Sequence, residues 1–187
     1  MDRDGDVWRE RAIRDAVLGG DAAAWRAWYD EHFAPLAAYA SWRCGGLPDV
    51  AEDVLQQTWL TAVRRLRSFD PARGSFAAWL RGIAANAARN AVRDRRRYRR
   101  RARPLDAVSE SPAGEPDPAA AEKAERVAVA LAALPDHYEA VLRAKYLDRL
   151  SVEAIAAAQG SSPKAVESLL TRARQAFREA YEAEHHD

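Results

Sequence analysis

Several residue types that carry common protein chemistry are scarce in this sequence of 187 residues. Its single cysteine, Cys44, cannot form an internal disulfide or a cysteine-based metal cluster, which predicts a structural thiol in a reducing compartment. Each of the four histidines lacks a second metal-binding side chain at a suitable spacing on the same helix face, so we expect neither a metal nor another cofactor. These histidines are His32, His137, His185 and His186.

Strand signals and long apolar runs are also missing. No segment alternates β-branched and polar residues for long, which argues against a β-rich fold. The apolar runs are rich in alanine and too short to span a bilayer, and the acidic first six residues are not followed by the apolar stretch of a signal peptide. We therefore expect an all-α protein that stays in the cytoplasm and does not insert into a membrane.

Patterns typical of enzymes are absent as well. The sequence has no glycine-rich phosphate loop and no nucleophile elbow, and Glu52 and Asp53 are neighbours that point to different faces of a helix. An RNA-processing enzyme would need a metal or an acid–base site, and neither is found. We therefore expect a protein without enzymatic activity.

The charge is distributed unevenly, although the net charge is only +1. Residues 71–103 contain eleven arginines and one acidic residue, Asp94, which gives this segment a charge of +10 and leaves −9 for the remainder. Such a basic segment on an acidic protein indicates a local site for a polyanion. Only three of the 29 basic residues are lysines. Arginine suits bidentate contacts with phosphate and guanine, but the codon usage of a GC-rich genome would produce the same preference.

Helical periodicity dominates the first half of the chain. Asp21 is a candidate cap for a helix that we expect to end before Pro35, with a second helix following it. Gly45 and Gly46 interrupt the pattern, and another helix begins near Asp49. Its apolar side is expected to face inward. That side comprises Val50, Val54, Leu55, Trp59, Leu60, Val63 and Leu66.

A long helix begins after a turn at residues 70–74, with Ser75 as its cap. Its inward side chains should be Phe76, Trp79, Leu80, Ile83 and Ala87. Its polar stripe comprises Asn86, Asn90, Arg93 and Arg97, with Arg89 beside it. Amides next to guanidiniums suit both base edges and phosphates. For the arginine-rich run at residues 95–101, a solvated helix end is the alternative interpretation, but repulsion among so many like charges favours a polyanion partner.

Composition divides the chain into two small helical domains joined by a flexible linker. Residues 104–120 are acidic and rich in proline, which is typical of an extended linker. We place an N-terminal helical bundle at residues 7–103 and a C-terminal helix-turn-helix domain at residues 121–181, and we expect each domain to fold independently.

The C-terminal domain carries the pattern of a DNA-binding helix-turn-helix. Residues 151–156 form its first helix, residues 159–161 its turn, and Ser162 caps a second helix with Pro163 at its first position. Short polar and basic side chains are predicted on the outer face of that second helix, where they can reach base edges. They are Lys164, Glu167, Ser168, Thr171, Arg172 and Arg174. An ordinary helical hairpin with a solvated face is the alternative.

Three groups of segments, in this order, resemble the extracytoplasmic-function (ECF) sigma factors of the sigma-70 family. The first is residues 51–59, AEDVLQQTW. The second combines Phe69 with residues 75–80, SFAAWL, and residues 83–86, IAAN. The third combines residues 134–135, 141–142, 146–147, 150–156 and 162–174. Together these segments cover nearly the whole chain.

The resemblance implies a sigma factor that directs core RNA polymerase to specific promoters and starts DNA melting. Its implied partners are the clamp coiled coil and the flap of the polymerase, promoter DNA and an anti-sigma factor. Asp53, Gln56 and Gln57 would bind polymerase, and the polar stripe defined above, together with Arg89, would read and melt the −10 element. The outer face of the second helix of the helix-turn-helix would read the −35 element.

Several residues depart from the family pattern, so the promoter sequence does not transfer from the resemblance. The family usually has Glu at Gln57, an aromatic residue at Arg81, Arg at Gly82, a basic residue at Glu167 and Arg at Leu169. Two other functions would fit parts of the sequence. A dimeric helix-turn-helix repressor or activator would explain only the C-terminal half, and a decoy that binds only protein would not support transcription.

Overall fold

The computed structural model describes residues 3–102 and 118–183, and all the regular secondary structure in these two ranges is helical. The N-terminal part contains α1 (Arg3–Leu18), α2 (Ala22–Arg43), α3 (Pro48–Arg65), the short 3-10 helix η1 (Leu66–Ser68) and α4 (Phe76–Ala102). The C-terminal part contains α5 (Pro118–Ala133), α6 (Asp136–Tyr146), α7 (Val152–Gln159) and α8 (Pro163–Ala183). The all-α prediction is confirmed. The expected linker lies outside the described residues, except for residues 118–120, which begin α5.

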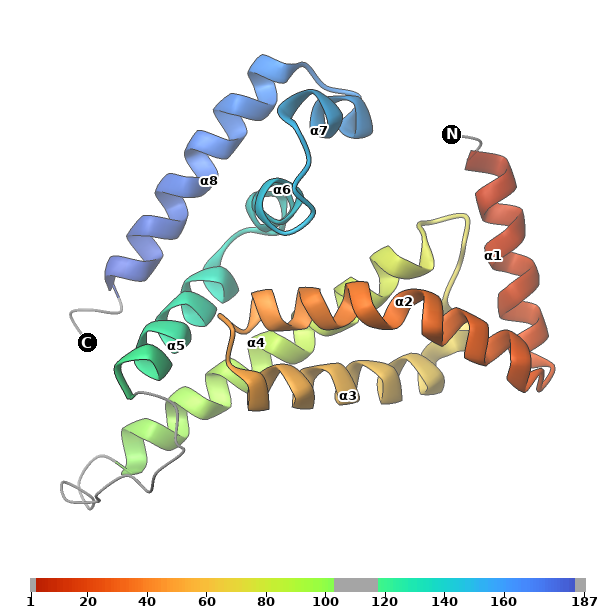
Figure 1. Ribbon diagram of the computed structural model, residues 1–187, viewed down its shortest axis with the longest axis horizontal. Coiled ribbons are helices and arrows are strands. Elements are labelled where there is room, and N and C mark those ends of the chain that lie inside the picture. Colours follow the sequence, from red (N-terminus) through yellow and green to blue (C-terminus); the bar gives the residue numbers. More distant parts are fainter. Residues whose placement is uncertain (1–2, 103–117, 184–187) are drawn as a thin grey trace.

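The N-terminal domain is a bundle in which α2 and α3 lie side by side and α4 crosses both of them (Figure 1). Asp21 caps α2 as expected, because its Oδ1 accepts the N–H groups of Ala23 and Ala24 at 2.9 and 3.0 Å. An aromatic cluster fills the core, and in it Trp28 stacks on Phe76 with 3.7 Å between the ring centroids.

The expectation that Pro35 separates two helices is wrong, because α2 continues through it. Proline removes the hydrogen bond to the carbonyl one turn earlier, which usually breaks a helix. Here Pro35 is exposed, so water can reach that carbonyl. Trp28 before the proline and Leu36 after it are both buried in the same core. Packing on both sides therefore keeps the helix continuous.

The inward face of α3 also differs from the prediction. Val54 is buried as expected, but Leu60 and Val63 are 46% and 56% exposed. The small residues Thr58 and Ala62 are buried in their place, at 0% exposure each. The Thr58 hydroxyl is satisfied within the helix because it donates to the Val54 carbonyl at 2.6 Å. The buried face of α3 therefore includes small side chains as well as large apolar ones.

The C-terminal domain has a hydrophobic core of its own, formed where α5, α6 and α7 pack against α8. Its most deeply buried side chains include Val141, Ile155, Val166 and Leu170. Two separate cores confirm the prediction of two helical domains.

The two domains contact each other at the C-terminal end of α2. Gly45 adopts a left-handed φ of +67°, and a Cβ atom there would lie 2.0 Å from the Ala124 carbonyl oxygen of α5. Trp42 packs against both cores. Tyr39 is buried at this contact near Arg43 of its own helix and Glu139 of α6, and burial raises its pKa. The domains therefore meet along a packed interface.

Candidate nucleic-acid interface

Helix α4 presents the predicted polar stripe on its outer side. Asn86, Asn90, Arg93 and Arg97 are all exposed. The opposite side is buried at intervals of four residues and comprises Phe76, Leu80, Ala84, Ala88 and Val92. Ile83 and Ala87, which were predicted to face inward, are only half-buried. The buried stripe holds α4 against α2 and α3, and this packing directs the amides and guanidiniums outward.

Each asparagine of the stripe is oriented by an arginine one turn further along. Asn86 Oδ1 accepts a hydrogen bond from Arg89 Nη2 at 2.8 Å, and Asn90 Oδ1 accepts one from Arg93 Nη2 at 3.0 Å. Because each amide oxygen faces a guanidinium, each amide NH2 group points away from it as a donor. An exposed amide donor flanked by cations suits a base edge beside a phosphate backbone.

Two arginines of α4 form ion pairs with the C-terminal domain. Arg89 Nη1 lies 3.3 Å from Asp136 Oδ1 of α6. Arg95 Nε lies 3.8 Å from Glu125 Oε2 of α5, and Glu125 is only 8% exposed. Arg97 instead pairs with Asp94 of its own helix at 3.6 Å. Acidic side chains therefore already neutralise part of the basic segment.

A loop at residues 69–75 leads into α4. Asp70 shapes its turn by accepting the Ala72 N–H at 3.0 Å, and Ser75 caps α4 by accepting the Ala78 N–H at 3.2 Å. The loop forms one wall of an open hollow of about 420 Å³ that Trp79 also lines.

Two residues of α1 that the sequence did not single out hold this loop. Glu10 accepts a hydrogen bond from the Phe76 N–H, and Arg14 donates one to the Phe69 carbonyl. The sequence offers no signal for these contacts, because their partners lie 66 and 55 residues further along the chain.

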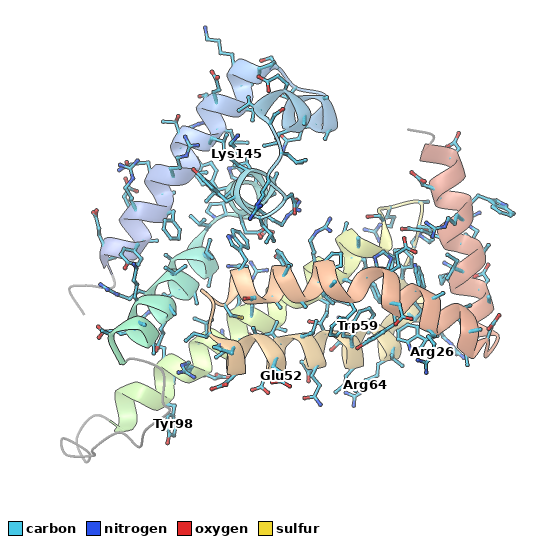
Figure 2. The ribbon with its side chains drawn as sticks, in the orientation of Figure 1. Arg26, Glu52, Trp59, Arg64, Tyr98 and Lys145 are labelled. Atoms are coloured by element: carbon cyan, nitrogen blue, oxygen red, sulfur yellow. The ribbon has the colours of Figure 1, made fainter. Side chains whose placement is uncertain are left out.

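The predicted polymerase-binding residues Asp53, Gln56 and Gln57 are all exposed on α3. They line a groove of about 420 Å³ between α3 and α4, together with Asn90. The structure therefore brings two sets of predicted site residues to one groove. Figure 2 shows Glu52, their neighbour on α3, pointing away from the bundle.

The helix-turn-helix forms as predicted. Ser151 caps α7 by accepting the Ala154 N–H at 3.1 Å, and Gly160 ends α7 in the left-handed conformation with φ of 59°. Ser162 accepts the Ala165 N–H at 3.2 Å and so starts α8. Val166, Leu170 and Ala173 are buried, which fixes the rotation of α8 and exposes its other face.

That face presents most of the predicted −35-type residues, which are exposed. They are Lys164, Glu167, Ser168, Thr171 and Arg172. The expectation that Arg174 faces outward with them is wrong. Arg174 is half-buried, and its Nε donates to the Tyr146 hydroxyl of α6 at 2.8 Å while its guanidinium lies over the Tyr146 ring.

The residues that depart from the family pattern lie in different surroundings. Arg81 is half-buried near Arg143 and Asp148, and burial lowers its pKa. Gly82 is exposed, and a Cβ there would have open space around it. Leu169 packs against the C-terminal core, so an apolar side chain suits that position.

Within residues 3–102 and 118–183, no cluster of histidine, cysteine and carboxylate side chains is arranged to hold a metal ion. Over the same residues, no helix is long and apolar enough to cross a membrane.

Comparison with known families matches both domains. The model of sigma-70 region 2 matches residues 28–98, and the model of sigma-70 region 4 matches residues 124–177. The chain is 32% identical over 180 residues to the ECF RNA polymerase sigma factor SigE of Mycolicibacterium smegmatis, a match that covers 93% of this chain and 68% of that protein. It is 37% identical over 131 residues to the RNA polymerase sigma factor CarQ of Myxococcus xanthus, covering 70% of this chain and 74% of that protein.

A solved structure of CnrH in complex with the cytosolic domain of CnrY is also similar, with 30% identity and a TM-score of 0.49. That match covers 93% of this chain and 97% of the other. The two family matches and the two relatives show that the chain belongs to the ECF sigma factors of the sigma-70 family.

Proposed function

We propose that three surfaces of this sigma factor divide the work of promoter recognition. The stripe on α4 reads and melts the −10 element, the exposed face of α8 reads the −35 element, and Asp53, Gln56 and Gln57 of α3 bind the clamp coiled coil of core polymerase. The observation that carries the assignment is the orientation of Asn86 and Asn90, whose amides are exposed and turned by Arg89 and Arg93.

The polymerase surface extends along α3 beyond the three polar residues. Leu60 and Val63 are exposed on the same helix. Exposed apolar side chains beside polar ones are typical of protein interfaces. We infer that these two residues contact polymerase together with Gln56.

Further parts of the proposal follow from the family. The chain works in the cytoplasm, where core polymerase is, and supplies recognition while polymerase supplies catalysis. An anti-sigma factor controls it, as the family resemblance implies. Arg174 stays at the edge of the −35 surface, because Tyr146 holds its guanidinium.

Asn86→Ala tests the −10 assignment. An amide on a base edge contributes about 1–3 kcal/mol of discrimination, so promoter opening should slow at least about tenfold while association with polymerase is unchanged. Permanganate footprinting measures opening, and co-purification with core polymerase measures association. Gln175→Ala is the matched control, because Gln175 is an exposed amide on α8 that bonds Glu179. Normal opening combined with lost association would make α4 a protein interface and overturn the assignment.

A further inference from the structure

Helix α1 holds both ends of the loop that precedes α4. Glu10 accepts the Phe76 N–H through both carboxylate oxygens, at 2.9 and 3.1 Å. Arg14, one turn further along α1, donates from Nη1 to the Phe69 carbonyl at 3.0 Å. One helix therefore fixes the first and the last backbone group of the segment 69–76.

The chemistry of both contacts favours a stable arrangement. The Phe76 N–H belongs to the first turn of α4, whose N–H groups have no partner within the helix, and a carboxylate also suits the positive end of the helix dipole. Asp15 Oδ1 accepts from Arg14 Nε and Nη2 at 3.0 and 2.8 Å, which orients the guanidinium so that Nη1 reaches Phe69. Hydrogen bonds with a charged partner are stronger than neutral ones.

Packing reinforces the same geometry from the other side. The rings of Phe69 and Phe76 contact each other with 5.4 Å between centroids, and both contact Trp28 of α2. The segment between them forms a wall of the hollow that Trp79 lines. Asn86 lies ten residues beyond Phe76 on the same helix, about 15 Å away at 1.5 Å per residue. The loop therefore lies at the N-terminal end of α4, about 15 Å before the exposed stripe begins.

We propose that Glu10 and Arg14 are positioning residues for promoter opening, and that they act by holding the 69–75 loop against the DNA strand that α4 engages. The sigma-70 region 2 match begins at residue 28, so α1 lies outside it. This inference rests on the proposed role of α4 in reading the −10 element. It adds that the loop must be held rigidly at both ends, and that α1 does so.

Four variants test the proposal in holoenzyme reconstituted with core polymerase. Glu10→Ala removes the acceptor and Arg14→Met removes the donor, whereas Glu10→Gln and Arg14→Lys each keep one hydrogen-bonding group. Loss of a hydrogen bond with a charged partner should slow opening of a linear duplex promoter by about tenfold in the first two variants. The conservative variants should stay within about threefold of wild type. All four should bind core polymerase as wild type does, and a template with a pre-melted −10 segment should restore the first two.

Arg9→Met is the matched control, because Arg9 joins α1 to Glu31 of α2 at 2.9 Å and does not bond the loop. It should open promoters normally. An equal defect in Arg9→Met would show that docking of α1 matters and not its contacts with the loop, and would overturn the proposal. Normal opening in Glu10→Ala and Arg14→Met would also overturn it. In that case a slow Asn86→Ala variant would leave the role of α4 intact, whereas a normal Asn86→Ala variant would refute that role as well.

Discussion

Asp136, the first residue of α6, lies 3.3 Å from Arg89 of α4, so the C-terminal domain touches the arginine that orients Asn86. The pair is exposed, with 37% of the Arg89 side chain and 89% of the Asp136 side chain accessible. Exposed ion pairs contribute at most about 1 kcal/mol. This ion pair therefore contributes little to the docking of the domains. The apolar packing at Trp42 and the close approach at Gly45 contribute more.

Gly45→Ala should separate the two domains. A Cβ atom at Gly45 would lie 2.0 Å from the Ala124 carbonyl oxygen, which is far too close for a contact. The radius of gyration in small-angle X-ray scattering should rise above that of wild type. Gly46→Ala is the control, because Gly46 also has a positive φ, of +86°, but a Cβ there meets nothing within 4 Å. Asp136→Asn should leave the radius nearly unchanged, and an equal increase in Gly46→Ala would assign the effect to backbone strain.

Arg172→Ala and Arg174→Ala should differ in their effect on duplex binding. Arg172 is exposed on the outer face of α8, so its loss should reduce the slope of log affinity against log salt by about one. Arg174 is held against Tyr146, so its loss should leave the slope unchanged. Gel shifts at several salt concentrations measure both slopes. Arg26→Ala, an exposed arginine of α2 far from α8 (Figure 2), controls for net charge. A reduced slope in Arg174→Ala would mean that Arg174 does contact DNA.

Ser151→Ala should destabilise the helix-turn-helix. Its hydroxyl oxygen accepts the Ala154 N–H at 3.1 Å, and loss of such a cap costs about 1 kcal/mol. Urea unfolding measures the free energy of unfolding. Ser151→Asp is the matched variant, because aspartate caps helices as well as serine does, and it should keep the stability of wild type. An equal loss in both variants would mean that the hydroxyl is needed for something other than the cap.

Cys44 should make folding sensitive to alkaline pH. Burial raises the pKa of its thiol from 9.0 to about 11, so the folded protein resists deprotonation more than the unfolded chain does. The stability that depends on the neutral thiol is complete below about pH 9 and is lost as the pH rises toward about 11. Urea unfolding across this range should show a larger loss for wild type than for Cys44→Ala. Parallel losses in the two proteins would show that other groups, such as the buried Tyr39, account for the effect.

Local features of the fold were predictable because they depend on residues three or four positions apart. Asp21, Ser75 and Ser162 each cap a helix as the sequence indicated. The α4 stripe of asparagines and arginines followed from helical periodicity alone. In the same way, three segments of family-like sequence were enough to indicate a sigma factor, since matching side chains recur at matching spacings.

Features that depend on which helices meet could be settled only by the tertiary structure. Pro35 stays inside α2 because residues on both sides of it enter one core, and Leu60 is exposed because none of the helices in residues 3–102 and 118–183 covers it. Arg174 bonds the Tyr146 hydroxyl, 28 residues earlier in the sequence, and is thereby held away from the outer face of α8. Glu10 bonds the Phe76 N–H of α4, 66 residues further along the chain. Periodicity along one helix shows that a residue lies on a given face, but it does not show what that face packs against.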